Sequence, residues 1–176
     1  KILEIDVKHF NNNLHHLGVS TFEPNMLRQI HLGRIRISDL KKDTYKVAFQ
    51  NLLSVLQKDG NLMNLKENLE LIVLDYSEAQ YRGLKEAFET NDCDINFENV
   101  VCGCRVHFCR SVERVAKLLT SDEKEKAEFK SLSDLFFYSP DSRKSTVDLL
   151  LKKYPLCKNF IDWWNRKHIL QMIDNS

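Results

Sequence analysis

The sequence contains few of the residues that interrupt regular structure, with 5 glycines and 3 prolines among 176 residues. This scarcity excludes a collagen-like chain and a proline-rich linker. No apolar run reaches the about 18 residues of a membrane span, and early acidic residues disrupt any signal-peptide pattern. An excess of one charge is also lacking, because 26 Lys and Arg oppose 25 Asp and Glu. A globally basic nucleic-acid coat is therefore excluded, whereas a local basic face is not.

The rest of the composition is that of a globular protein, with 43% apolar and 29% charged residues. The length fits one domain, or one domain with a short appended subdomain. The five cysteines are an odd number, and Cys102, Cys104 and Cys109 are clustered. Clustering of this kind favours a reduced compartment, the cytoplasm or nucleus, over a secreted disulfide framework. We expect a domain excised from a longer protein, whose own secretion signal stays an open question.

Three segments near the N-terminus alternate between apolar and polar residues. They span residues 2–10, 14–22 and 29–37, and the first two are separated by the turn signal Asn11-Asn12-Asn13. Alternation with a period of two predicts β-strands, and short turns between them predict an antiparallel meander.

Apolar spacing becomes helical after this meander and then alternates between helix and strand. The predicted elements are helix 43–57 closed by a turn at 59–61, strand 69–74, a helix capped by Ser77, strand 99–102 and helix 106–119, followed by helices 124–137, 143–152 and 158–173. This order predicts an α/β fold of ribonuclease-H-like type, a mixed sheet with helices on both faces. We expect the core to occupy residues 1–120 and a helical C-terminal extension to occupy residues 121–176.

Two acidic residues stand where such a sheet can bring carboxylates together. Asp6 lies within strand 2–10, and Asp75 directly follows strand 69–74. Two converging carboxylates can bind Mg²⁺ or Mn²⁺, and two ions about 4 Å apart can catalyse phosphodiester displacement. The alternative interpretation is a solvent-facing Asp6 and a helix-capping Asp75. Ser77 can cap that helix instead, which favours Asp75 as a ligand.

The most unusual segment runs from Cys102 to Arg110. Cys104 and His107 have a spacing that permits Zn²⁺ binding, but zinc needs a further pair of ligands, such as Cys102 or Cys109 with Cys157 or His168. We favour the alternative, in which Cys104 and Cys109 are small buried residues and His107 is a hydrogen-bonded core histidine. A catalytic Cys–His pair is disfavoured because nothing indicates an activated thiolate.

Basic residues recur on two elements and are candidates for phosphate contact. Strand 29–37 carries two of them on one face, and helix 106–119 carries four; they are Arg34, Arg36, Arg105, Arg110, Arg114 and Lys117. The alternative is that these charges are simply solvated. The same helix is expected to direct Val106, Cys109, Val112, Val115, Ala116 and Leu119 inward.

Four segments together resemble Mutator-like element transposases of a divergent fungal type. In that family the second catalytic aspartate ends a strand, as in Leu71–Ala79, and a Gly-Cys-x-x-His-Phe motif opens the next helix, as in Cys102–Arg110. Ile5–Phe10 occupies the place of the family's first aspartate strand. Asp43–Phe49 is similar to its ETYxxxF helix.

The resemblance covers roughly residues 1–120 and implies a ribonuclease-H-like catalytic domain of DDE type. It implies that Asp6 and Asp75 are the first two acids of the triad, and that Cys104 and His107 are the family's C-x-x-H pair. The implied activity is Mg²⁺-dependent cleavage and strand transfer of DNA in the nucleus.

Two departures from the family pattern bear on activity. The family's first strand reads Asp-x-Thr/Ser-Phe, whereas this sequence has one residue more between Asp6 and Phe10. One of the residues between them is Lys8, whose positive charge would compete with a bound cation. The third acid is expected on a helix beyond Ser176. We therefore expect this fragment to be incomplete or inactive as a nuclease.

Two functional hypotheses follow, with a structural zinc module as a third. The first is a transposase catalytic core that acts on DNA. The second is a domesticated, non-catalytic module that binds nucleic acid or protein partners, such as a nuclear regulator or an effector. The near-neutral charge and Lys8 favour the second for this chain.

Overall fold

The computed structural model describes residues 2–11, 14–58, 69–91 and 95–175. These residues form two compact units, each described here by itself. The first unit ends at Gly103 and also includes Asn175, and the second runs from Cys104 to Asp174. The predicted turns at 11–13 and 59–61 lie wholly or largely outside the described residues.

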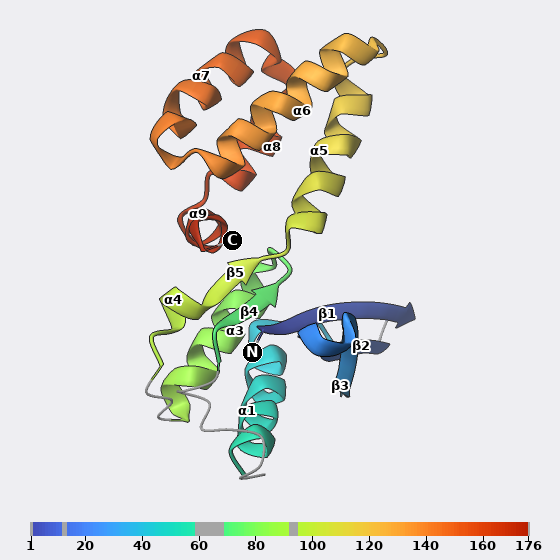
Figure 1. Cartoon of the computed structure of the whole chain (residues 1–176), viewed down its shortest axis with the longest axis vertical. Helices are drawn as coiled ribbons and strands as arrows, with labels where there is room; N and C mark the ends of the chain where they lie inside the picture. Colours follow the sequence, from blue (N-terminus) through green and yellow to red (C-terminus); the bar gives the residue numbers. More distant parts are fainter. Residues whose placement is uncertain (1, 12–13, 59–68, 92–94, 176) are drawn as a thin grey trace. The chain divides into compact units, whose positions relative to one another are not determined.

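The first unit is built on a five-stranded mixed sheet (Figure 1). Its strands lie in the order β3-β2-β1-β4-β5. The first three strands pair antiparallel, whereas β4 pairs parallel with β1 and with β5. The bounds of the strands are β1 Ile2–Asn11, β2 Leu14–Glu23, β3 Arg28–Ile37, β4 Leu71–Leu74 and β5 Val101–Gly103. The α/β class and the antiparallel meander predicted from the sequence are thus confirmed.

Strand register separates the sheet into an apolar and a polar face. Ile5 of β1 lies opposite Val19 of β2, and both are buried. The next pair, Asp6 opposite Gly18, faces the other way because successive residues of a strand alternate between faces. The same alternation gives the polar face Lys8, which lies opposite His16.

Helices α1 (Lys42–Lys58) and α3 (Glu78–Thr90) pack closely against each other in the first unit. The close approach depends on Gly83, since a Cβ there would lie 2.7 Å from the Cβ of Tyr45 and 2.9 Å from the carbonyl oxygen of Lys42. Buried aromatic and aliphatic side chains of both helices, Tyr45, Phe49, Leu53, Leu84 and Phe88, form the core beside the sheet. Two short helices, η1 (Pro24–Met26) and α4 (Phe97–Val100), complete the unit.

The second unit is entirely helical in its described residues. It contains α5 Arg105–Leu119, α6 Glu123–Tyr138, η2 Pro140–Ser142, α7 Arg143–Lys153, η3 Pro155–Cys157, α8 Lys158–Trp164 and α9 Lys167–Asp174. Phe108 is at the centre of its core, with ring centroids 4.6 Å from Phe137 and 4.8 Å from Trp164. These contacts explain why α5 groups with the helical unit, whereas the sequence-predicted core extends to residue 120.

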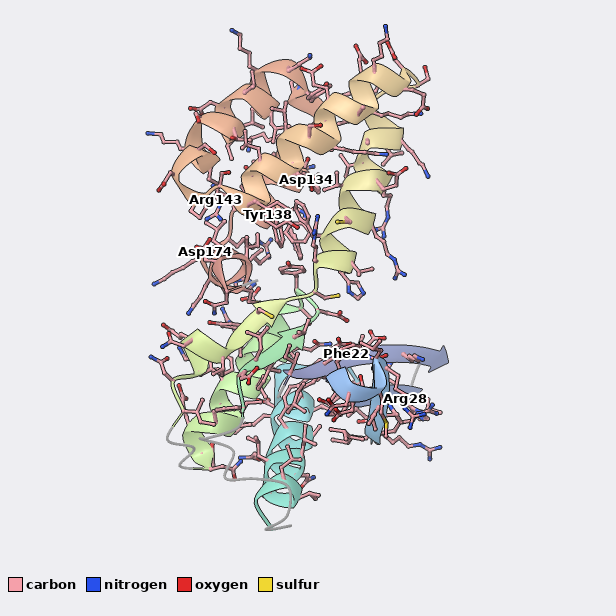
Figure 2. All side chains as sticks on the ribbon, in the orientation of Figure 1. Phe22, Arg28, Asp134, Tyr138, Arg143 and Asp174 are labelled. Atoms are coloured by element: carbon pink, nitrogen blue, oxygen red, sulfur yellow. The ribbon has the colours of Figure 1, made fainter. Side chains whose placement is uncertain are left out.

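An arginine links two helices of the second unit (Figure 2). The Nη2 of Arg143 donates to the Oδ1 of Asp174 at 2.7 Å, and its Nε donates to the carbonyl oxygen of Phe136 at 3.0 Å. The guanidinium also lies 5.5 Å from the centroid of the Phe136 ring. Charge-assisted hydrogen bonds of this kind fix both position and orientation. Arg143 therefore ties α9 to the junction of α6 and α7.

Two predicted elements differ from the structure in their bounds. The single helix expected over 158–173 is two helices, because α8 ends at Trp164 and α9 begins at Lys167. The strand expected over 99–102 is β5 at 101–103, preceded by the helical turn 97–100. Asn96 explains the second difference, since its side chain accepts a hydrogen bond from the backbone N–H of Glu98 at 3.1 Å and so starts a helix there.

Candidate metal site and polar groove

Asp6 and Asp75 are brought together by the register of two parallel strands. Glu4 of β1 is the register partner of Val73 of β4, so Asp6, two residues further along β1, lies beside Asp75, the first residue after β4. Neighbouring strands are about 4.8 Å apart, and residues in register point to the same face. The pairing therefore directs both carboxylates to the polar face of the sheet.

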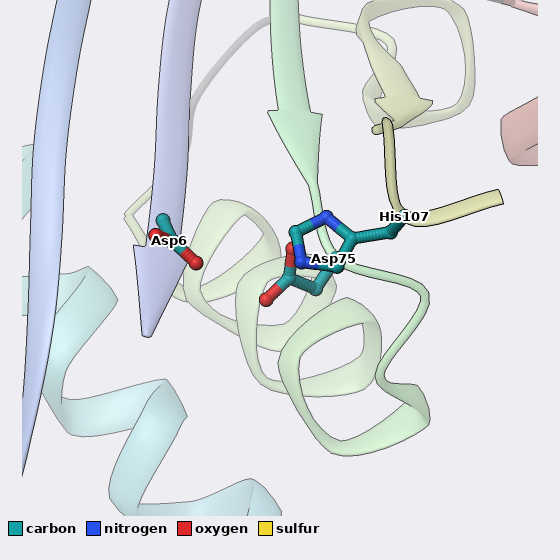
Figure 3. Close-up of side chains that lie close together, drawn as sticks. All are labelled: Asp6, Asp75 and His107. Atoms are coloured by element: carbon teal, nitrogen blue, oxygen red, sulfur yellow. The ribbon is translucent and has the colours of Figure 1, made fainter. Parts of the chain in front are cut away.

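The two carboxylates each offer an oxygen to the same space. One oxygen of Asp6 and one of Asp75 lie within 4.8 Å of each other. Figure 3 shows the two side chains extending from neighbouring strands. Asp6 is exposed and Asp75 is half-buried. Two like charges this close repel each other unless a cation is shared, and oxygen donors suit Mg²⁺ or Mn²⁺.

The backbone that follows Asp75 is held in place by close packing against β5. A Cβ at Gly103 would lie 2.1 Å from the ring of Tyr76, so only glycine permits the ends of β4 and β5 to approach. Burial, and to a smaller extent the charge of Asp75, raise the pKa of the Tyr45 hydroxyl, while a hydrogen bond with Gln80 opposes the rise. Tyr45 therefore stays a neutral hydroxyl at pH 7.

A polar groove lies on the same face of the sheet as Asp6. It has a volume of about 180 Å³, and its lining comes from β1, β2 and β3. The residues used below are Asp6, Lys8, His16, Gly18, His31 and Arg34. We refer to this hollow as the polar groove. Of the predicted phosphate-contacting residues, it contains Arg34, whereas Lys8, His16, Gly18 and His31 were not expected there.

The other predicted basic residues are placed differently. Arg36 lines a separate cavity of about 620 Å³ beside α1. In the second unit, Arg105 lies 4.7 Å from the centroid of the Tyr138 ring, and Lys117 pairs with Glu113 at 3.3 Å. Arg110 and Arg114 are exposed. The structure thus leaves Arg34 as the one candidate in the polar groove, and phosphate contact by the others stays a prediction.

The cysteines do not assemble a zinc site in the described part of the chain. There, no group of three ligand atoms within binding reach includes a cysteine. Cys104 is half-buried at the start of α5 and Cys109 is exposed, so the expectation that Cys109 is buried is wrong. Cys157 is buried and its thiol donates to the carbonyl oxygen of Leu150. Burial raises the pKa of the Cys157 thiol and so favours its protonated form.

His107, the third residue labelled in Figure 3, belongs to the first turn of α5 in the second unit. Its backbone N–H donates to the carbonyl oxygen of Cys104 at 3.0 Å, so the C-x-x-H pair is part of one helical turn. The pair by itself supplies only two of the ligands that zinc needs.

Comparison with known proteins gives no relative for this chain. No protein-family model, no curated protein and no solved structure matches it. Among the described helices, none combines the length and hydrophobicity that crossing a membrane requires.

Proposed function

We propose that the first unit is a ribonuclease-H-like domain of transposase descent that binds a divalent metal ion through Asp6 and Asp75. The observation that carries this proposal is that carboxylate oxygens of Asp6 and Asp75 lie within 4.8 Å of each other, just beyond the last register pair of β1 and β4. Three antiparallel strands followed by two parallel ones, in the order β3-β2-β1-β4-β5, support the fold assignment.

A metal ion at this position would act on a phosphodiester. Held by Asp6 and Asp75, Mg²⁺ or Mn²⁺ would polarise a phosphoryl oxygen and make a coordinated water more acidic. Two carboxylates leave most coordination positions to water and substrate oxygens, as Mg²⁺ prefers. The transposase resemblance implies a third acidic ligand besides Asp6 and Asp75, so for these two residues we propose metal binding, and DNA cleavage only where a third acid joins them.

A second candidate function is a non-catalytic module that binds nucleic acid or a protein. The observation that favours it is Lys8, which lines the polar groove together with Asp6. An ammonium group two residues from Asp6, on the same face of β1, reduces the affinity for a cation by repulsion. Under this second proposal, the fold and the polar groove are retained from a transposase ancestor, and metal binding is lost.

Metal titration followed by amide NMR tests the first candidate. We expect Mg²⁺ to shift the amide signals of Asp6 and Asp75, and Asp75→Asn to weaken binding about tenfold or more by removing a ligand. Asp43→Asn is the matched control, because Asp43 is exposed on α1 in the same unit. Its affinity is expected to stay within about twofold of wild type, since exposed charges contribute little.

Lys8→Ala separates the two candidates in the same titration. Removal of the ammonium group is expected to tighten Mg²⁺ binding in a metal-binding domain. The metal proposal is contradicted by the absence of any response to Mg²⁺ or Mn²⁺ up to tens of millimolar in both wild type and Lys8→Ala. The second candidate is then the one supported.

A further inference from the structure

The polar groove contains more positive than negative charge. Lys8 and Arg34 are the basic residues of the lining, and Asp6 is its acidic residue. At one end of the groove Gln29 donates to the Oγ of Ser20 at 2.9 Å and also to the carboxylate of Glu4. Glu4 is four residues from Lys8 along β1, so the positive charge of Lys8 and Arg34 is opposed mainly by Asp6, and an anion is attracted to their end of the groove.

The two cations of the groove are not neutralised by neighbours. Among the described residues, neither Lys8 nor Arg34 forms an ion pair. Other cations of the first unit are paired, as Lys42 is with Glu86 at 2.7 Å and Lys85 with Glu98 at 3.1 Å. An ion pair would consume the charge that a ligand needs. The ammonium group of Lys8 and the terminal nitrogens of Arg34 therefore keep hydrogen-bond donors for a bound anion.

Arg34 is oriented for such a ligand. Its Nε donates to the Nε2 of His31 at 3.2 Å, a hydrogen bond between two residues of the lining that restricts the orientation of the guanidinium. A guanidinium has five N–H donors, so the two terminal nitrogens remain to bind oxygen atoms in a bidentate manner. Planar, bidentate donors of this kind match the oxygens of a phosphate group.

Gly18 lines the groove without occupying it with a side chain. A Cβ at Gly18 would lie 3.7 Å from both the Cε1 of His31 and the carbonyl oxygen of Asp6, an ordinary van der Waals distance. No described glycine has a positive φ angle, so the backbone at Gly18 accepts any residue. A side chain at this position would fill the groove without straining the strand. The volume of about 180 Å³ holds about six water molecules, enough for a phosphate group and part of its substituent.

We propose that the polar groove binds a phosphate monoester or diester group through Lys8 and Arg34, in the space that Gly18 leaves open. This phosphate site stands on the groove alone. One consequence rests on the proposed function: because Asp6 belongs to both sites, a metal ion on Asp6 and Asp75 cancels the repulsion between Asp6 and the phosphate. Metal and phosphate therefore strengthen each other's binding.

Amide NMR titration of the full chain in metal-free buffer tests the site, with inorganic phosphate and a nucleoside 5′-monophosphate as probes. We expect shifts at Gly18, His31 and Arg34. Arg34→Ala is expected to weaken binding about tenfold, as loss of a bidentate charged contact does. Gly18→Val is expected to weaken it at least as much by filling the groove.

Gly33→Val is the matched control for Gly18→Val. Gly33 lies on the neighbouring strand β3, and a Cβ there meets no atom within 4 Å. The same substitution is therefore expected to leave phosphate affinity within about twofold of wild type. Equal weakening by both valine variants, unchanged affinity in Arg34→Ala, or no binding at about 50 mM phosphate would overturn the proposal.

Two further measurements determine which kind of molecule supplies the phosphate and whether a metal ion takes part in binding it. If a single-stranded DNA oligonucleotide binds more tightly than the mononucleotide, and Gly18→Val weakens this binding, the ligand of the groove is the phosphate of a nucleic-acid backbone. If the mononucleotide binds more tightly than the oligonucleotide, the ligand is a free nucleotide. Saturating Mg²⁺ is expected to tighten mononucleotide binding in wild type, and Asp75→Asn to remove this enhancement. If phosphate binds without metal and Mg²⁺ does not enhance its binding, the proposed metal site at Asp6 and Asp75 is contradicted. If Mg²⁺ binds but phosphate does not, the proposed phosphate site in the polar groove is contradicted.

Discussion

Leu27 adopts a backbone conformation that its side chain disfavours. Its φ angle is +48°, in the left-handed region, and its side chain is 82% exposed in the turn between η1 and β3. The left-handed region costs an L-residue about 1–2 kcal/mol because Cβ approaches the carbonyl oxygen. The exposed side chain recovers little of this cost through packing.

We therefore expect Leu27→Gly to stabilise the first unit by up to about 1 kcal/mol, after the larger unfolded-state entropy of glycine is subtracted. Chemical denaturation monitored by amide NMR of the first unit measures the change. Leu27→Ala is the control, since it removes the same exposed side chain but keeps the Cβ, and is expected to change stability by less than about 0.5 kcal/mol. A Leu27→Gly variant less stable than Leu27→Ala would contradict the prediction.

Phe108 shows where residue-scale reasoning from the sequence succeeds and where it fails. The helical period correctly predicts burial of Val112 and Ala116, but Val106 is 53% exposed and Cys109 is also exposed. The buried stripe of α5 includes Phe108 instead. Val106 and Phe108 lie on different sides of the helix, and the larger aromatic surface gains more from burial. Periodicity gives the existence of an apolar stripe, whereas packing partners decide its angular position.

At the scale of elements, α5 begins without the side-chain capping hydrogen bond that α3, α4 and α6 have. Cys104 is its N-cap residue with extended backbone angles, φ −69° and ψ 108°, yet its side chain makes no capping hydrogen bond. By contrast, the Oδ1 of Asp122 caps α6 by accepting from the backbone N–H of Lys124 at 2.8 Å. The backbone at Cys104 thus already has the shape that a capping side chain requires.

Cys104→Ser is expected to stabilise the second unit by about 0.5–1 kcal/mol, because a serine hydroxyl accepts the hydrogen bond that the thiol does not. Thermal unfolding in the presence and absence of a chelator measures this change. Asp122→Ala, which removes an existing cap, is expected to destabilise the unit by about 1 kcal/mol. If Cys104 instead held zinc, Cys104→Ser would destabilise the protein and the chelator would lower the stability of the wild type.

Strands and helices were predictable from the sequence to the extent that they depend on local pattern. The meander β1–β3 and the alternating elements after it follow from periods of 2 and 3.6 residues. The approach of Asp6 and Asp75 depends on the register of β1 and β4, two strands about 70 residues apart in the chain. The predicted fold class suggests that these two strands are neighbours. Local sequence pattern alone does not determine their register. The polar groove was missed because its lining depends on the register of β1, β2 and β3 together.

At the scale of the whole molecule, two compact units share one chain, and the candidate metal ligands Asp6 and Asp75 both belong to the first. A ligand stabilises the unit that binds it, by about 1.4 kcal/mol at ten times its Kd. We therefore expect Mg²⁺ to slow amide hydrogen exchange in β1 and β4, and to leave exchange in α6 and α7 unchanged. Exchange measured by mass spectrometry with and without Mg²⁺ gives both responses at once, and Asp75→Asn is expected to abolish the first. Equal slowing in both units would show that Mg²⁺ acts on the chain as a whole, and slowing confined to α6 and α7 would place the metal in the second unit; either result contradicts the Asp6–Asp75 site.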